Sequence, residues 1–345
     1  MLFFVGLGVE QSPSLESIEV MKSCDRLFFE SYTTPAIKDA SGVIEASTGK
    51  KVEKVKREFV EDGRKILELS KSSNIALVTF GDPMIATTHQ ELRTRAINQT
   101  IETRIVHASS ILCALPGELG LHSYSFGKSV TMTREPMQSS AYLAVFQNLL
   151  RGLHTTILLE WDESSQFFLS PRFALQGLID TEKDLKYGIV SDDSLVLSAS
   201  GIGGVSTRVR ADSLRDACEM DYGPPPHALV FPGRLHFTEI EALSALTGKE
   251  EKFFLDNSQN VERVAKRMVL KYAMKTLAAL ERARISAQAK DNRILESVFE
   301  NVEAYTEDSK RFLNEGREEL AILSIGYAEG LLDSLRFSGQ IEFEW

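Results

Sequence analysis

Two short segments combine residues that could hold a ligand with the turns that would present them. Gly6-Leu-Gly8 follows an apolar run at the start of the chain, and Gly81-Asp82-Pro83 follows the apolar run Ile75–Phe80. A buried strand that ends in a glycine turn is typical of α/β proteins, which bind ligands at the carboxyl ends of their strands. Asp82 would there face a cationic or polar ligand, and it equally fits the cap of a helix that starts at Pro83. The residues alone are compatible with both interpretations.

Three weaker candidates lie further along the chain. Ser109 and Ser110 come after the short apolar run at 105–107, where serines cap helices or present hydroxyl and N–H groups to a ligand. His227 follows three prolines that would hold it rigidly at a loop edge, although a lone histidine is more often structural than catalytic. The glycine-rich run at 198–204 would let a ligand approach the backbone closely, or form a tight turn.

Missing motifs exclude several common chemistries. The first glycine turn lacks the third glycine of a dinucleotide fingerprint, and no Gly-x-x-x-x-Gly-Lys-Ser/Thr phosphate loop occurs. There is no Gly-x-Ser-x-Gly elbow and no His-Glu-x-x-His, and the six histidines show no metal-ligand spacing. We therefore predict neither a metal site nor a covalent catalytic residue.

Charge and composition limit the partners and the compartment. The formal net charge is −10, and neither the first 249 residues nor the remainder is basic, so we expect no direct binding to nucleic acid or to an anionic membrane. No run of 18 apolar residues occurs, and the apolar start lacks the basic flank of a secretory signal. Three widely spaced cysteines suit a reducing compartment. The expected location is the cytoplasm.

The elements that must position these residues form an α/β pattern. Strands and helices alternate over residues 1–130, which predicts an open parallel sheet with helices on both faces and a first helix capped by Ser12, with Pro13 at its first position. Residues 131–248 contain strand-like runs at Ile157–Trp161, Ser194–Ser200 and Ala228–Phe231, separated by one or two helices, which predicts a second α/β domain with a mixed sheet.

Strand signals disappear after residue 249. Apolar residues then recur at helical spacing, as in Leu295, Val298, Phe299, Val302 and Tyr305. Residues 250–345 are therefore predicted to form an all-α unit of three helices. The fold class is α/β in two domains, followed by a helical bundle.

The order and spacing of a set of short segments over about residues 1–248 resemble those of the archaeal diphthine synthases. The segments are Met1–Gly8, Cys24–Arg26, Glu30–Thr33, Gly81–Thr88, His107–Ile111, Gly120–His122, Phe126–Lys128, Arg151–Thr155, Pro224–His227 and Pro232–His236. The resemblance implies the two-domain tetrapyrrole-methylase fold, a homodimer, and a methyltransferase that uses S-adenosyl-L-methionine and releases S-adenosyl-L-homocysteine. It further implies that the substrate is translation elongation factor 2, whose 3-carboxy-3-aminopropyl-histidine is methylated on its amine during diphthamide biosynthesis.

The same resemblance implies a set of cofactor contacts. Carried over position by position, they fall on Val9, Asp82, Ile85, Ser110, Ile111, Leu159, Ile202 and His227. Several are apolar, which suits a pocket that grips its ligand largely through backbone groups. The reaction implied is a direct displacement that needs alignment and a dry cleft, so no catalytic side chain is nominated.

The helical region resembles a small archaeal domain of unknown function. Tyr305, Asp308, Tyr327 and Asp333 would form a polar site across two helices, or else the tyrosines pack and the aspartates are solvated. We hypothesise that this region recruits a partner. Two alternatives to the interpretation as a diphthine synthase stay open. One is a related methyltransferase with another substrate, and the other is a non-catalytic, cofactor-binding adaptor whose helical tail recruits a partner.

Overall fold

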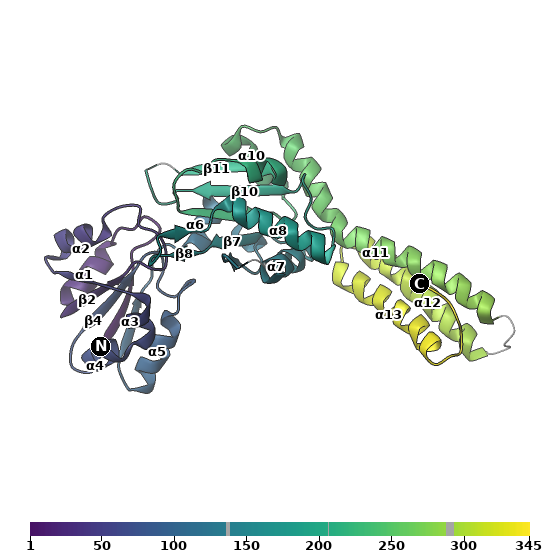
Figure 1. Ribbon diagram of the computed structural model, residues 1–345, viewed down its shortest axis with the longest axis horizontal. Helices are drawn as coiled ribbons and strands as arrows, with labels where there is room; N and C mark the ends of the chain where they lie inside the picture. Colours follow the sequence, from purple (N-terminus) through teal and green to yellow (C-terminus); the bar gives the residue numbers. More distant parts are fainter. Residues whose placement is uncertain (136–138, 206, 288–292) are drawn as a thin grey trace.

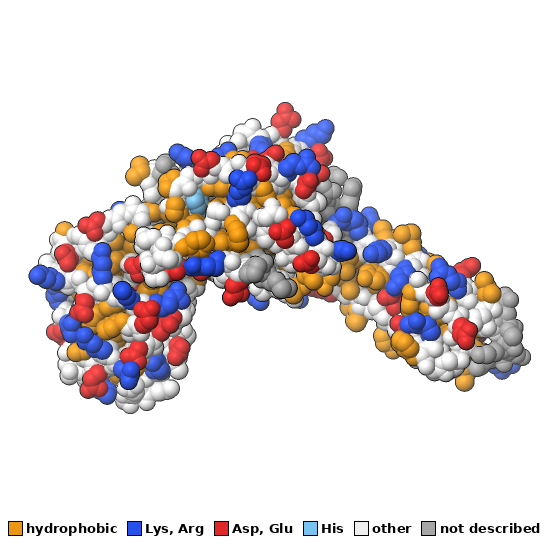
Figure 2. Space-filling view, viewed as in Figure 1, with side chains coloured by type: hydrophobic (Ala, Val, Ile, Leu, Met, Phe, Trp, Pro, Cys, Tyr) orange, Lys and Arg blue, Asp and Glu red, His pale blue; other side chains and the backbone are white. Residues whose placement is uncertain are grey.

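Two α/β lobes and a helical arm follow one another along the long axis of the molecule (Figure 1). The computed structural model describes residues 1–135, 139–205, 207–287 and 293–345, without the side chains of 257–265. On the face seen in Figure 2, basic and acidic side chains are interspersed over the N-terminal lobe. Among the described residues, no helix is both long and apolar enough to cross a membrane.

The N-terminal lobe is built on a five-stranded parallel sheet of order β3-β2-β4-β1-β5. Its strands are β1 (Leu2–Gly6), β2 (Arg26–Glu30), β3 (Val52–Val55), β4 (Ile75–Thr79) and β5 (Thr103–Val106). Side chains alternate between the two faces of β1, so Leu2 and Phe4 belong to one core and Phe3 and Val5 to another. Because all strands are parallel, their carboxyl ends meet at one edge of the sheet.

Helices cover both faces of this sheet. Those packed against Phe3 and Val5 are α1 (Leu15–Ser23) and α2 (Ala40–Thr48). Those packed against Leu2 and Phe4 are α3 (Arg57–Asp62), α4 (Arg64–Ser70) and α5 (His89–Asn98). The predicted open parallel sheet with helices on both faces is confirmed.

The second lobe is built on a mixed sheet of order β11-β10-β12-β7-β6, in which only the β6–β7 pair is parallel. Its strands are β6 (Val130–Met132), β7 (Thr155–Leu159), β10 (Leu195–Ser200), β11 (Arg208–Ser213) and β12 (His227–Phe231). A short hairpin, β8 (Trp161–Asp162) and β9 (Phe167–Phe168), extends from the end of β7. The predicted mixed sheet is confirmed.

Two helix layers cover the second sheet. One face packs against α7 (Ser139–Leu150), α8 (Pro171–Leu185) and α9 (Leu214–Glu219). The other packs against α6 (Ile111–Glu118) and α10 (Phe237–Thr247), and the 3₁₀ turn η1 (Ser123–Ser125) follows α6. Leu115 and Leu119, on and just after α6, share a core with Leu197 of β10, so the change from one core to the other falls before the boundary predicted at residue 130.

The arm consists of α11 (Glu251–Ala287), α12 (Arg293–Asn314) and α13 (Glu318–Phe337). Phe254, near the start of α11, is buried in the second lobe, and Met268 packs against the core of that lobe. The remainder of α11 packs with α12 and α13 around Phe299, Val302 and Leu332. One unbroken helix therefore joins the body to the predicted three-helix unit (Figure 1).

Two local predictions are wrong. Helix α1 is capped by Ser14, whose Oγ accepts the N–H of Ser17, and not by Ser12 followed by Pro13. Asp82 and Pro83 do not begin a helix, because Asp82 Oδ1 accepts the N–H of Met84 in a turn and α5 begins only at His89. An aspartate forms such turns with the same sequence signature as a helix cap, so the sequence did not separate the two.

Candidate functional site

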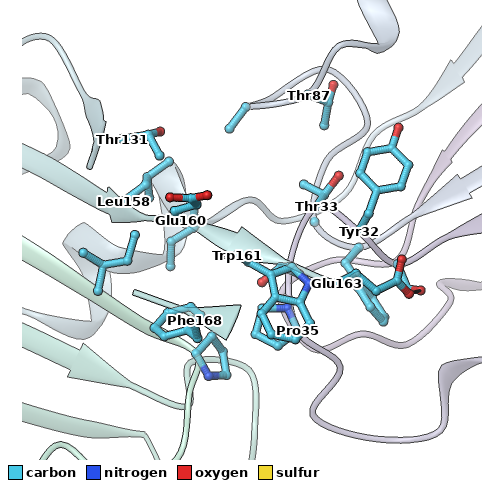
Figure 3. A pocket seen from close by; sticks show the side chains of 18 of the residues that line it. Tyr32, Thr33, Pro35, Thr87, Thr131, Leu158, Glu160, Trp161, Glu163 and Phe168 are labelled. Atoms are coloured by element: carbon cyan, nitrogen blue, oxygen red, sulfur yellow. Dashed lines mark hydrogen bonds between the residues drawn. The ribbon is translucent and has the colours of Figure 1, made fainter. Parts of the chain in front are cut away.

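A cavity of about 1170 Å³ lies between the two lobes, where the carboxyl ends of the parallel strands face the second sheet. One side consists of the turns after β1, β2, β3 and β4, and the other of the ends of β6, β7 and β10 with the start of β12. Figure 3 shows Tyr32, Thr33 and Pro35 on one side, across from Leu158, Glu160 and Phe168. A cavity of this size holds a nucleoside-sized ligand together with part of a second molecule.

All eight residues predicted to contact a cofactor line this cavity. They come from both lobes: Val9, Asp82, Ile85, Ser110 and Ile111 from the first half of the chain, and Leu159, Ile202 and His227 from the second. Residues separated by more than 200 positions in sequence thus share one site. Their contact with a cofactor stays a prediction.

Asp82 joins the turns that follow β4 and β5, the two strands on either side of β1 in the sheet. Its Oδ2 lies 2.7 Å from Nδ1 of His107 and accepts the N–H of Ala108 at 3.2 Å, while Oδ1 accepts the N–H of Met84 at 2.9 Å. Its side chain is only 7% exposed, whereas that of His107 is 67% exposed. The carboxylate therefore fixes the turns after β4 and β5, and its buried charge lies at the cavity wall.

The backbone turns at the site approach one another closely, and at Gly203 a side chain would not fit. Gly8 and Gly81 exchange backbone hydrogen bonds at 3.2 and 3.0 Å. Gly203 has φ +81°, and a Cβ on it would collide with the carbonyl group of Val9 in the other lobe. The glycine-rich run at 198–204 thus comprises the end of β10 and a tight turn at 201–204, whose backbone meets the first glycine turn.

The two adjacent serines have different roles. Ser109 Oγ accepts the N–H of Val9 at 3.1 Å and donates to Glu10 Oε2 at 2.7 Å, so this side chain supports the first glycine turn. Ser110 lies at the N-cap of α6, and its N–H donates to Sγ of Cys113 at 3.1 Å. The interpretation as a helix cap therefore holds for Ser110 and not for Ser109, and of the two only Ser110 lines the cavity.

His227 presents an unused acceptor. Its Nε2 donates to the carbonyl oxygen of Tyr222 at 3.0 Å, which assigns the proton to that nitrogen. Burial lowers the pKa of His227 below its ordinary value, so the ring is neutral near pH 7. Nδ1 is buried and has no hydrogen-bond partner among the described residues. The ring centroids of His227 and Phe168 lie 5.5 Å apart.

Glu30, which was not predicted as a site residue, is fully buried beneath the cavity. Its carboxyl group accepts the N–H groups of Tyr32 and Thr33 at 3.1 and 3.2 Å, and the hydroxyl groups of Thr33 and Thr79. Burial raises the pKa of Glu30, although these hydrogen bonds oppose the shift. The group fixes the turn after β2 and so orients Tyr32 and Thr33 along the wall.

The β8–β9 hairpin was also missed as part of the site. Trp161 pairs with Phe168 across the hairpin, and both line the cavity. Arg134 Nη2 bonds to Glu160 and Asp162, each at 2.9 Å, and so ties the hairpin to the end of β6. Ser31 Oγ donates to Glu163 Oε1 at 2.6 Å, which joins the two lobes over the cavity. Strands of two residues leave no periodic signal in a sequence.

No group of three or more potential metal ligands occurs among the described residues. In the arm, the rings of Tyr305 and Tyr327 meet with centroids 4.9 Å apart. Asp308 instead pairs with Arg311 on its own helix, and Asp333 with Arg336 and with Nε1 of Trp345. These four residues do not converge on one polar site. The two tyrosine rings contact each other, with Tyr327 55% exposed, and both aspartates form ion pairs.

The model for "Tetrapyrrole (Corrin/Porphyrin) Methylases" matches residues 1–179, half of the chain. The chain belongs to the tetrapyrrole methylase family. Within this family it is 32% identical to a diphthine synthase of Methanothermobacter thermautotrophicus over 72% of this chain and 96% of the relative. The diphthine synthase of Methanosarcina mazei is 36% identical over 73% of this chain and 98% of the relative.

A crystal structure of a diphthine synthase superposes on this methylase with a TM-score of 0.66 and 28% identity, over 73% of this chain and 98% of that chain. A second model, "Protein of unknown function (DUF357)", matches residues 271–341 in the arm. The resemblance of the first 248 residues to the diphthine synthases and the separate nature of the helical region are therefore confirmed. The chain is a methyltransferase of class III, the class to which this family belongs.

Proposed function

We propose that this methyltransferase is a diphthine synthase that uses S-adenosyl-L-methionine to methylate the amine of the 3-carboxy-3-aminopropyl-histidine of translation elongation factor 2. The observation that supports this proposal most is the convergence of all eight predicted cofactor residues on one cavity between the lobes. The diphthine synthase relatives, which match over almost their whole length, support the choice of substrate.

The residues of the cavity fit the proposed cofactor. The turns at Gly8 and Gly81 leave backbone groups at the wall where a Cβ would stand, which suits a ligand held by main-chain contacts. His227 Nδ1 is a buried acceptor without a partner among the residues that the structure describes, and such a group is costly unless a ligand or water satisfies it. Leu159, Ile202 and Ala228 supply an apolar surface for an adenine ring.

When bound, the cofactor would supply a sulfonium methyl group to the lone pair of the amine, with the N–C bond forming as the C–S bond breaks and S-adenosyl-L-homocysteine leaving. The protein has to align the amine, exclude water and keep the site rigid. Alignment alone provides effective-molarity gains of about 10⁵ M or more. Asp82, Ser109 and Glu30 perform the alignment indirectly, because each fixes a turn that forms the wall. The proton released by the methylated amine passes to solvent.

The test is mass spectrometry of archaeal elongation factor 2 that carries the aminocarboxypropyl histidine, after incubation with the full chain and S-adenosyl-L-methionine. Stepwise gains of one methyl mass on that histidine are expected, and the plateau counts the methyl groups. Calorimetry with S-adenosyl-L-homocysteine runs in parallel, with Asp82→Ala as the variant expected to lose affinity. Cofactor binding without any mass gain would contradict the proposed substrate and favour another acceptor or a non-catalytic adaptor.

We also propose, from the resemblance of the first 248 residues, that the protein is a homodimer. Light scattering on the purified full chain is expected to give twice the 38.5 kDa mass of the monomer. A mass of one chain over the micromolar range would contradict it.

A further inference from the structure

The positive charges of the cavity come from a single short segment. Among the described residues that line it, lysine and arginine occur only at Lys54, Lys56 and Arg57, at and just after the end of β3. Glu58 adds one negative charge, which leaves a net charge of two positive units on this segment. We call Lys54, Lys56 and Arg57 the cationic edge.

The fold places the cationic edge beside the turn after β2. Strand β3 is one of the two outer strands of the parallel sheet, and its Val55 pairs with Glu30 at the end of β2. Successive side chains of a strand point to opposite faces, so Lys54 and Lys56 share a face while Val55 is buried in the core. The guanidinium carbon of Arg57 lies 5.1 Å from the ring centroid of Tyr32. Because Glu30 holds the backbone of Tyr32, this ring is a fixed platform for Arg57.

The cationic edge keeps its charges available for a ligand. Within the described parts of the chain, no ion pair engages Lys54 or Lys56, and Arg57 reaches Glu61 only at 3.7 Å, with both side chains about half exposed. Such a surface pair contributes little.

The carboxylates across the cavity are engaged by protein groups. Arg134 binds Glu160 and Asp162, and the hydroxyl group of Ser31 binds Glu163. Among the described residues that line the cavity, the cations that could bind the carboxylate of an acceptor therefore lie on the cationic edge.

We propose that the cationic edge binds the carboxylate of the methyl acceptor, with Arg57 as the bidentate partner and the lysines as supporting charges. This inference rests on the proposed function and adds how the acceptor is oriented. The cationic edge lines the same cavity as Asp82 and His227, so an α-amino acid group held there by its carboxylate has its amine inside the cavity. The cationic edge therefore favours acceptors in which the amine and the carboxylate are attached to the same carbon.

The experiment compares the full chain with Lys56→Gln/Arg57→Gln, using elongation factor 2 with the aminocarboxypropyl histidine and the same protein with that carboxylate converted to a carboxamide. In the double variant, the KM for the carboxylate substrate is expected to rise at least tenfold. The affinity for S-adenosyl-L-homocysteine should stay within about twofold, because neither residue is among the predicted cofactor contacts. The double variant should also lose the preference of the wild type for carboxylate over carboxamide. Arg57→Lys, which keeps the charge but not the planar fork, should fall between the two.

The matched control is Lys51→Gln, since Lys51 directly precedes the same strand and does not line the cavity. All changed residues are exposed, so thermal melting should be unchanged in every variant. An active wild type together with a double variant that retains its KM and its carboxylate preference overturns the cationic edge and leaves the proposed function standing. A wild type that binds the cofactor but methylates neither protein overturns both.

Discussion

The methylase body and the helical arm use their polar residues in different ways. In the body, polar groups from distant strands converge on one cavity, and a buried nitrogen of His227 is left without a partner there. In the arm, charged residues pair with neighbouring helices or within one helix, as in Arg284 with Glu303 and Arg311 with Asp308. The difference lies in the arrangement: polar groups of the body line a common cavity, whereas the ion pairs of the arm lie on its helices.

The two regions nevertheless share one continuous helix. Helix α11 begins in the core of the second lobe with Phe254 and ends in the core of the arm with Ala283 and Ala287. Because α11 is continuous, it fixes the orientation of the arm relative to the body. The described residues of the arm do not line the cavity. The comparison therefore predicts that the chemistry of the body and the stability of the arm respond to different substitutions.

The largest expected effect is on the arm. Phe299 is 1% exposed in the core of the arm, so Phe299→Ala is expected to destabilise the arm by about 3–5 kcal/mol. Hydrogen exchange should accelerate in α12 and α13 and stay unchanged in the parallel sheet, while affinity for S-adenosyl-L-homocysteine is retained. Glu300→Ala, on the exposed side of the same helix, is the control. A loss of cofactor affinity beyond about threefold would show that the two regions are coupled.

The second prediction concerns the body alone. Gly203→Ala combines a left-handed backbone with a collision against the carbonyl group of Val9, so it should separate the turns that close the cavity. We expect cofactor affinity to fall tenfold or more, which corresponds to about 1.4 kcal/mol. Gly49→Ala has a similar φ of +72° but nothing within 4 Å of the added carbon, so it separates backbone strain from the collision. Equal affinities for the two variants would disprove the role of the collision.

The sequence predicted those elements whose signals are local. The apolar run at 75–80 indicated β4 because a strand buried on both faces reads as a continuous apolar run. Strand β11 (Arg208–Ser213) was not predicted, since an edge strand with three charged residues lacks that pattern. The assignment of α6 to the second sheet was also missed, because α6 directly follows strand β5 of the first sheet and only its packing reveals its partner.

The residues of the site also differ in whether a local sequence signal predicts them. The eight cofactor positions came from the resemblance, whose motifs are local segments. Glu30 and Ser31 were missed as site residues because their roles depend on contacts with Thr79 and Glu163, which lie 49 and 132 positions away. No periodicity or spacing in one sequence reports such contacts.

The third prediction concerns the pH dependence of stability that results from the buried carboxyl group of Glu30. Burial raises the folded-state pKa of Glu30 above its ordinary value of 4.5, so the protonated group favours the folded state. This contribution is fully present below about pH 4.5 and is lost as the pH rises through the folded-state pKa.

Glu30→Gln removes the titration. The variant should be less stable than the wild type by about 1–3 kcal/mol at low pH. The N–H groups of the new side-chain amide would face the N–H and O–H groups that donate to Glu30 in the wild type. The difference should shrink as the pH rises through that window. Urea titrations at several pH values measure it, with the exposed Glu53→Gln as control. A difference that does not change with pH would contradict the raised pKa.

The smallest expected effect lies at the junction of the two regions. Arg151 Nε is 3.3 Å from Glu319 Oε1 at the start of α13, with side chains 65% and 72% exposed. An exposed pair of this kind contributes below about 1 kcal/mol and is screened by salt. The direction of the arm is instead set by α11, through the packing of Met268 and the hydrogen bond from Arg267 to the carbonyl oxygen of Gly188 at 2.9 Å. A double-mutant cycle of Arg151→Ala and Glu319→Ala should therefore give a coupling energy near zero at high salt, with the small-angle scattering profile unchanged. A change in the scattering profile of either single variant would mean that this one pair orients the arm, and the body and the arm would then have to be treated as a single unit.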